Sequence, residues 1–280
     1  MTDGATGALA RHVVVGLKRS QRAVVDEAAG EAVRRGVALR VVHSVWLPLY
    51  ETSTDKGARL RAAGQDVLDA AHRLVAESPT QVHTEFVLSL RPPVVTLLDE
   101  ARSATCLVVG TTELRWFDRL RGNEVTTRVA RQARCPVLVV PDAVDGPRRG
   151  VVVGVDVEPL SHAVLARAVE EAELRGCGLR LLHAVRPGHT ARAARRAHDV
   201  VDRAADGVRT SHPRLEVATT VATAGVGTAC VEASKAAELL VLGRPRQTPV
   251  ERVLAGHVSM GVLRSARCPV LITTGAASMA

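Results

Sequence analysis

Cysteine and histidine are the residue types most often used for catalysis and metal binding. This chain has five cysteines and ten histidines. They form no CxxC, HxxxH or HExxH grouping, so we expect no metal site. The cysteines are odd in number and dispersed in apolar segments, which favours reduced, buried thiols. Two histidines, His43 and His183, end matching apolar runs. No serine or cysteine nucleophile with an orienting acid falls at a matching position, so we expect hydrogen-bonded histidines at a sheet edge and no catalytic set.

The charge pattern limits the classes of partner. The formal net charge is +8, and only three of the 37 basic residues are lysines. The arginines are mixed with acids along every predicted helix, and the five aromatic residues are too few for a base-stacking surface. We therefore expect the arginines to lie on solvated helix faces, with no specific nucleic-acid partner. The P-loop signature is also absent, and we do not expect an enzyme.

No run of 18 apolar residues occurs, which predicts no membrane span. The first residues have neither a basic region nor an apolar core typical of a signal peptide. The expected location is cytoplasmic.

The chain repeats itself at the length of a whole domain. Four segments recur in the same order with offsets of 138, 140, 133 and 133 residues, beginning at His12 and Gly150, Arg40 and Arg180, Cys106 and Leu239, and Ala133 and Ala266. Such a period indicates a duplicated domain and excludes a solenoid of short repeats. We predict two domains, 1–141 and 150–280.

Each matched segment is a short, unbroken apolar run bounded by Gly or Pro, the pattern of a strand buried on both faces of a parallel sheet. The predicted strands are 12–16, 38–45, 82–88, 105–110 and 136–140, then 150–155, 178–185, 215–222, 238–243 and 269–273. Helical periodicity between them predicts helices at 22–35, 57–78, 92–103, 122–133, 161–176, 190–210, 226–236 and 250–265. Alternation of strand and helix predicts an α/β fold of two tandem doubly wound domains, each a five-stranded parallel sheet flanked by helices.

These residues resemble the universal stress protein family over nearly the whole of both units. The resemblance rests on an ordered set of segments, Gly154-Val-Asp-Val-Glu-Pro-Leu-Ser161, Leu182-His183, Leu242-Gly243 and Cys268-Pro-Val-Leu-Ile272. The resemblance implies a stress-response protein. Members of the family divide into those that bind ATP and those that do not, and the residues of one loop distinguish the two classes. Binding members carry a Gly-x-x-Gly-x9-Gly-(Ser/Thr) loop and an Asp after the first strand. The glycines admit phosphate oxygens to backbone N–H groups, and the Asp accepts hydrogen bonds from adenine or ribose.

The first unit departs from that pattern. Glu113 replaces the second glycine, Gly122 comes one residue early, and Leu17-Lys-Arg-Ser20 stands where the Asp would be. A carboxylate repels phosphate, and its Cβ blocks close approach. We expect no nucleotide in this unit.

The second unit keeps more of the pattern. Asp156 is present, and Gly243 and Gly256 have the family spacing. Arg246 replaces the middle glycine, and His257 replaces the Ser/Thr. Two interpretations stand: arginine and histidine donors replace the backbone contacts to an anion, or the loop is degenerate and its arginines are merely solvated.

The resemblance thus implies ATP or another adenine nucleotide in the second unit only. The predicted binding residues are Asp156, Ala184, Gly243, Arg244, Arg246, Gly256, His257, Val258 and Ser259. The alternative is an interaction module with both pockets degenerate. In the family the last strand commonly mediates dimerisation, which here implies an intramolecular pseudo-dimer through 136–140 and 269–273, or a homodimer.

Overall fold

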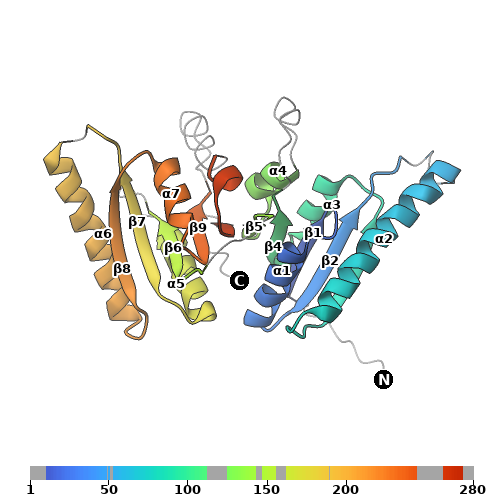
Figure 1. The fold of residues 1–280 in the computed structure, drawn as a ribbon, viewed down its shortest axis with the longest axis horizontal. Coiled ribbons are helices and arrows are strands. Elements are labelled where there is room, and N and C mark those ends of the chain that lie inside the picture. Colours follow the sequence, from blue (N-terminus) through green and yellow to red (C-terminus); the bar gives the residue numbers. More distant parts are fainter. Residues whose placement is uncertain are drawn as a thin grey trace, which may run out of the picture. The chain divides into compact units, whose positions relative to one another are not determined.

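The computed structural model describes residues 11–48, 50, 53–111, 125–142, 147–155, 162–188, 190–244 and 261–273. They form two compact units, and the boundary between the units falls within strand β5 (Val137–Val140), after Val137. Figure 1 shows helices packed against a sheet in each unit.

The first half of the chain contains a sheet with strand order β3-β2-β1-β4-β5. Its elements are β1 (His12–Leu17), α1 (Arg22–Arg34), β2 (Ala38–Ser44), α2 (Asp55–Glu77), β3 (Thr84–Ser89), α3 (Pro93–Glu100), β4 (Ala104–Gly110), α4 (Val125–Gln132) and β5.

The second half repeats this order as β10-β9-β6-β7-β8. Its elements are β6 (Val151–Gly154), α5 (His162–Arg175), β7 (Leu179–Val185), α6 (Ala191–Ser211), β8 (Val217–Thr223), α7 (Val226–Ser234), β9 (Leu239–Gly243) and β10 (Val270–Thr273). The predicted fold class is confirmed, and each predicted strand lies within about two residues of an observed one. Of the predicted helix 250–265 only 261–265 is described, and that part is helical.

Burial explains the unbroken apolar runs. Val13, Val14 and Val15 of β1 are fully buried although successive side chains point to opposite faces. Helices therefore cover both faces of the sheet. All strand pairs with a described register run parallel, as pairs β1–β2 and β6–β7 do. In the first unit α1 packs on α2, and α3 packs on α4. Since the chain reverses its direction across the sheet after β3, right-handed crossovers place these two pairs on opposite faces.

Matching residues end the first helix of each unit. Gly36 after α1 and Gly176 after α5 have φ of 63° and 61°, a conformation that disfavours other residues. Gly36 N donates to Val33 O, and Val37 N donates to Ala32 O at 3.0 Å. The second unit repeats both bonds at the corresponding positions. These bonds satisfy helix carbonyls that would otherwise lack partners, and they direct the chain into the next strand.

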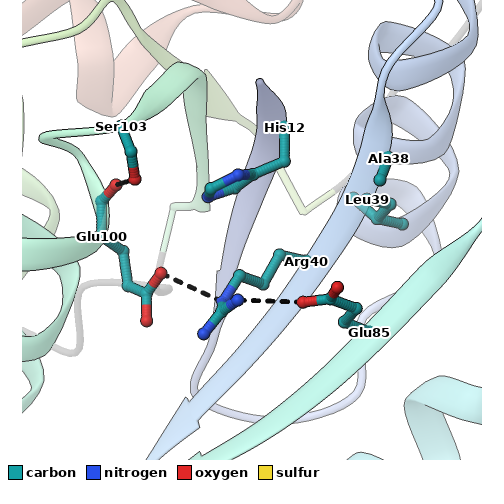
Figure 2. Close-up of a pocket in the computed structure, with 7 residues that line it drawn as sticks. All are labelled: His12, Ala38, Leu39, Arg40, Glu85, Glu100 and Ser103. Atoms are coloured by element: carbon teal, nitrogen blue, oxygen red, sulfur yellow. Dashed lines mark hydrogen bonds and ion pairs between the residues drawn. The ribbon is translucent and has the colours of Figure 1, made fainter. Parts of the chain in front are cut away.

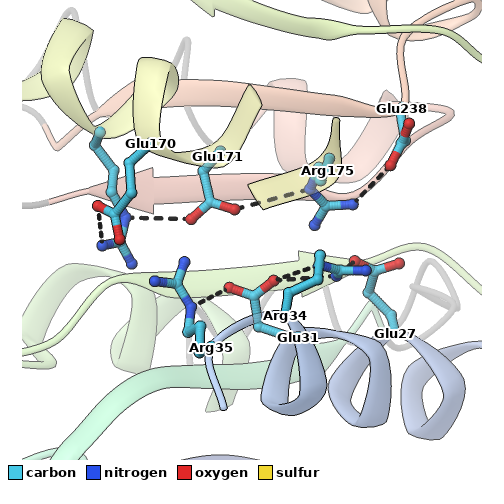
Figure 3. A network of polar contacts seen from close by, with 9 residues as sticks. Glu27, Glu31, Arg34, Arg35, Glu170, Glu171, Arg175 and Glu238 are labelled. Carbon is cyan, nitrogen blue, oxygen red and sulfur yellow. Dashed lines mark hydrogen bonds and ion pairs between the residues drawn. The ribbon is translucent and has the colours of Figure 1, made fainter. Parts of the chain in front are cut away.

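A buried ion pair also occurs at matching positions of the two units (Figure 3). On α1, the Nε of Arg35 donates to Glu31 at 2.6 Å, and the two side chains are 8% and 1% exposed. Arg34 contacts the second oxygen of Glu31 at 3.1 Å and also reaches Glu27 at 2.9 Å.

On α5, Arg175 and Glu171 are both 1% exposed, with Nε and Oε2 3.8 Å apart. Arg167 reaches the other oxygen of Glu171 at 3.3 Å, and Arg175 extends to Glu238 at 3.1 Å. The expectation that arginines lie on solvated helix faces is therefore wrong for Arg35 and Arg175. Each of these arginines follows a glutamate by four residues, and this spacing occurs on buried and on solvated helix faces alike. The sequence therefore does not reveal that the pairs are buried.

We expect Arg35→Met to destabilise the first unit by about 3 kcal/mol, because it leaves the carboxylate of Glu31 buried without its 2.6 Å contact. Denaturant unfolding, followed by circular dichroism, measures the change. Asp206→Asn is the matched control, since it breaks an exposed i,i+3 pair with Arg209 and should cost about 0.5 kcal/mol or less. Equal losses of unfolding free energy in the two variants would contradict a stabilising role for the buried pair of Arg35 and Glu31.

A second acid on α1 lacks such a partner. The Oδ1 atom of Asp26 is inaccessible to solvent and forms no hydrogen bond within the described part of the chain. Desolvation raises the pKa of this carboxyl above its usual 3.8, and the nearby Arg22 opposes the rise only in part. Protonation of Asp26 therefore favours the folded state, and this stabilisation is lost as the pH rises through the folded-state pKa.

Replacement by a neutral isostere should reverse that loss. We expect Asp26→Asn to raise the unfolding free energy at pH 7, and the gain over the parent should disappear as the pH falls below about 3.8, where both side chains are neutral. Urea unfolding of the two proteins across this pH range provides the measurement. If the difference in unfolding free energy between the two proteins stays constant with pH, the Asp26 carboxylate does not destabilise the folded state through desolvation.

Candidate functional site at the carboxyl edge of the second sheet

The second sheet has a switch in strand order at β6. From β6 the chain proceeds outward to β7 and β8 on one side, and β9 and β10 lie on the other side. The registers pair Gly154 with Leu182 and Val153 with Val241. The chain therefore leaves β6 and β9 next to each other at the carboxyl edge of the sheet. In open α/β sheets this is the place where ligands bind.

Two glycines allow close packing at this edge. A Cβ on Gly154 would lie 2.8 Å from a methyl of Leu242, and one on Gly243 would lie 2.9 Å from Cγ2 of Val164. Gly243 therefore lets the end of β9 pack on the first turn of α5. This packing is a structural reason for Gly243, in addition to the approach to phosphate that the resemblance implies.

The described binding candidates lie on both sides of β6. Ala184 is half-buried near the end of β7, in register with Ala222. Gly243 ends β9, and the backbone N of Arg244 donates to Thr273 O at 2.9 Å. The Nε and Nη2 atoms of Arg244 are inaccessible to solvent. The other predicted residues, Asp156, Arg246, Gly256, His257, Val258 and Ser259, lie outside the described residues.

The two histidines at the matched strand ends have matching hydrogen bonds. His183 Nδ1 lies 2.8 Å from the carbonyl oxygen of Val155, the residue that follows β6. His43 Nδ1 lies 2.7 Å from the carbonyl oxygen of Leu17 at the end of β1. Both are hydrogen-bonded at the sheet edge, as the sequence predicts, and each holds the end of a neighbouring strand.

At the corresponding edge of the first sheet, a side chain covers the glycine that matches Gly243. The carboxamide of Gln21 lies 3.0 to 3.2 Å from the point that a Cβ on Gly110 would occupy. Thr126 Oγ1 donates to the carbonyl of Gly110 at 3.0 Å. Polar protein groups thus contact the end of β4 directly. Glu113 and Gly122 lie outside the described residues.

A cavity of about 280 Å³ lies at the opposite, amino edge of the first sheet (Figure 2). It is lined by His12, Ala38, Leu39, Arg40, Glu85, Glu100 and Ser103. Arg40 projects between two acids and pairs with Glu85 at 2.9 Å and Glu100 at 3.1 Å (Figure 2).

Sequence reasoning missed this cluster because its members come from separate elements. The one available signal is the register of β2 with β3, which sets Arg40 opposite Glu85. In the second unit Arg180 faces Ala218, so the pair is not duplicated. With both carboxylates bound to Arg40, the arrangement is that of an ion-pair cluster at a strand end.

The remaining expectations about chemistry concern metals, thiols and membranes. The five cysteines all lie in described parts of the chain, and none of them forms a disulfide there. Four are buried, and Cys177 is half-buried. Burial is the main cause that raises the pKa of the Cys177 thiol, which disfavours the reactive thiolate. Within the described ranges no group of three potential ligands could hold a metal ion. No helix described in the structure has the length and apolarity needed to cross a bilayer.

Comparison with known proteins identifies the fold and the family. The model of the universal stress protein family matches twice, over residues 10–141 and 147–274. A universal stress protein of Mycobacterium tuberculosis is 29% identical, with 93% of this chain and 96% of the relative covered. Another from the same organism is 34% identical over 68% of this chain and 72% of its own length. The crystal structure of a universal stress protein from Archaeoglobus fulgidus has the same fold, with a TM-score of 0.70 at 16% identity, covering 94% of this chain and 96% of that one. The two matches in tandem, over most of the chain, make this protein a member of the universal stress protein family.

Proposed function

We propose that the protein is a stress-response regulator whose second unit binds an adenine nucleotide, with ATP as the first candidate, and that it does not turn the nucleotide over at an appreciable rate. The observation that supports this most is the switch in strand order at β6. Val155 and Arg244 lie on either side of it, and each leads directly into a segment that carries predicted binding residues.

The proposed roles follow from the chemistry of the side chains. Asp156 would accept hydrogen bonds from adenine or ribose, and Ala184 would contact the adenine. Gly256, His257, Val258 and Ser259 would donate hydrogen bonds to phosphate oxygens. Arg244 and Arg246 would supply positive charge in place of the backbone N–H groups that the missing glycine would have exposed.

The first unit is proposed to be a scaffold without a nucleotide. Lys18 stands at the position of Asp156, and Glu113 replaces a glycine. The Gln21 carboxamide, which lies 3.0 to 3.2 Å from the place of a Cβ on Gly110, would further reduce the space for a phosphate.

One observation favours a second candidate, an interaction module with two degenerate pockets that serve dimerisation or docking. The solvent-inaccessible nitrogens of Arg244 indicate a guanidinium turned toward the protein. An arginine engaged in this way would be less available to a phosphate. Light scattering would give the oligomeric state that this candidate requires.

We expect calorimetry to detect ATP binding to the intact chain, and Asp156→Ala to weaken it about 10- to 150-fold. That range corresponds to about 1.5–3 kcal/mol for a hydrogen bond that involves a charged group. ADP and cyclic AMP should compete for the same site.

Lys18→Ala is the matched control, because Lys18 occupies the equivalent position of the first unit. It should leave the affinity unchanged. Millimolar or absent ATP binding would refute the nucleotide proposal and favour the interaction module. An affinity that Asp156→Ala does not change would place the site elsewhere.

A further inference from the structure

Strand β8 is the outermost strand of the second sheet, and among the described residues it pairs only with β7. The register sets Leu179 opposite Val217, and Leu179 N donates to Glu216 O at 2.8 Å. In a parallel pair, alternate residues of one strand bond to the neighbouring strand. Three peptide units of β8 therefore face β7, those of residues 218, 220 and 222. The others face the open edge, at residues 217, 219, 221 and 223.

Two hydrogen bonds from β8 to α6 support this alternation. Arg209 Nη2 donates to the carbonyl oxygen of Val217 at 2.8 Å, from outside the sheet. Thr219 Oγ1 donates to Asp202 at 2.8 Å, so the side chains at odd positions face α6 and those at even positions face away. Thr220, at an even position, is exposed. Within the described part of the chain, no strand lies beside the outward peptide groups of Thr219 and Val221.

The sequence of β8 does not protect this edge from pairing. Edge strands are commonly protected by charged residues, prolines or bulges. Strand β8 reads Val-Ala-Thr-Thr-Val-Ala-Thr, with no charge and no proline, and five of its seven residues are β-branched. The outer strand of the first sheet, β3, carries Glu85 and is followed by Pro92 and Pro93. The second sheet therefore ends in a strand well suited to further pairing.

Strand β8 is complementary to a second copy of itself. If two copies run antiparallel around a two-fold axis that crosses the sheet at Thr220, all seven residues pair. Thr219 then faces Val221 of the second copy, and because both face outward they exchange both backbone hydrogen bonds. On the exposed face Thr220 meets its own equivalent, and Ala218 meets Ala222. This register sets no like charges opposite each other.

Helix α6 fits the same arrangement in its position. It packs on both β7 and β8, as Figure 1 shows. An axis perpendicular to the sheet keeps both copies of α6 on one face. Since neighbouring strands lie about 4.8 Å apart, helices that lie over β7 and β8 of each copy come about 10 Å apart, the usual distance for packed helices.

The charges on α6 are also complementary in this arrangement. Arg195, Asp202 and Asp206 are exposed and share one helix face by their spacing. The hydrogen bond of Asp202 to Thr219 places that face at the edge strand. Antiparallel pairing sets the first half of one helix beside the second half of the other. Arg195 of each copy therefore lies toward the half that carries Asp202 and Asp206 of the other copy.

We propose that the chain forms a homodimer through the open edge of β8, in which the second sheets of two copies join around a two-fold axis at Thr220. The interface is isologous, because each copy contributes the same strand edge and the same face of α6. It differs from the last strands, 136–140 and 269–273, through which the family resemblance implies dimerisation. It requires no nucleotide in the second unit.

The first test uses the wild-type chain. Sedimentation equilibrium should show a reversible dimer, and amide hydrogen exchange should slow with protein concentration at Thr219 and Val221. The amides of residues 220 and 222 should exchange slowly at every concentration, because they bond to β7. A chain that stays monomeric up to about 1 mM would overturn the proposal.

The second test introduces a charge at the proposed axis. Because Thr220 is exposed and points away from α6, Thr220→Lys should fold as the wild type does. Two lysines would face each other in the dimer, and we expect the dissociation constant to rise about tenfold or more. Thr220→Glu should have the same effect. An equimolar mixture of the two variants should associate to within about threefold of the wild-type affinity, since unlike charges then meet.

Ala62→Lys is the matched control, because it adds the same charge at an exposed position of α2 in the first unit. It should leave the dissociation constant unchanged. A dimer that Thr220→Lys does not weaken forms through another surface, and a mixture that fails to associate contradicts the axis at Thr220. If either Thr220 variant does not fold, exchange in the wild type decides, and Thr219 and Val221 amides that do not slow on dimerisation overturn the proposal.

Discussion

The fold depends on one constraint, the burial of parallel strands on both faces. The side chains of Val13, Val14 and Val15 alternate across the sheet, yet all three are buried. A parallel sheet of this kind must have helices on both sides, and right-handed crossovers can supply them only if the chain reverses its direction across the sheet once. That reversal places the ends of β6 and β9 side by side. The candidate site is therefore a consequence of covering the sheet.

The duplicated halves agree where backbone geometry and packing make demands. Gly36 and Gly176 have the same left-handed conformation, and Thr54 and Thr190 accept from backbone N–H groups at the starts of α2 and α6. The halves differ at a strand end that meets solvent, where Arg40 faces Glu85 in one unit and Arg180 faces Ala218 in the other. A residue that ends a helix or fills the core satisfies the same requirement in both units, whereas edge residues are free to diverge.

Eight of the described strands were predictable because they are short apolar runs that occur at matching positions in both halves, whereas β3 and β8 lie outside the recurring segments. Gly36 likewise revealed the end of α1, since a left-handed residue there is nearly always glycine. The burial of Glu31 and Arg35 was not predictable, because it depends on neighbours contributed by tertiary packing and not on spacing along the helix. The cluster around Arg40 escaped prediction for a related reason. Its acids come from β3 and α3, and only the register of the folded sheet brings Glu85 opposite Arg40.

For the candidate site the sequence predicts nine binding residues, of which the structure describes Ala184, Gly243 and Arg244. The family resemblance predicts that Gly243 is a phosphate-loop glycine, but Gly243 also packs against Val164 so closely that glycine would be required without any ligand. Such a glycine can persist after binding is lost, so its presence is weak evidence for a nucleotide. An acid after the first strand is stronger evidence, because the fold itself does not require one. The first unit keeps Gly110 and the hydrogen bond from His43 to the Leu17 carbonyl. In place of the acid it has Lys18. Asp156, more than the glycines, therefore distinguishes the unit proposed to bind from the one proposed to be a scaffold.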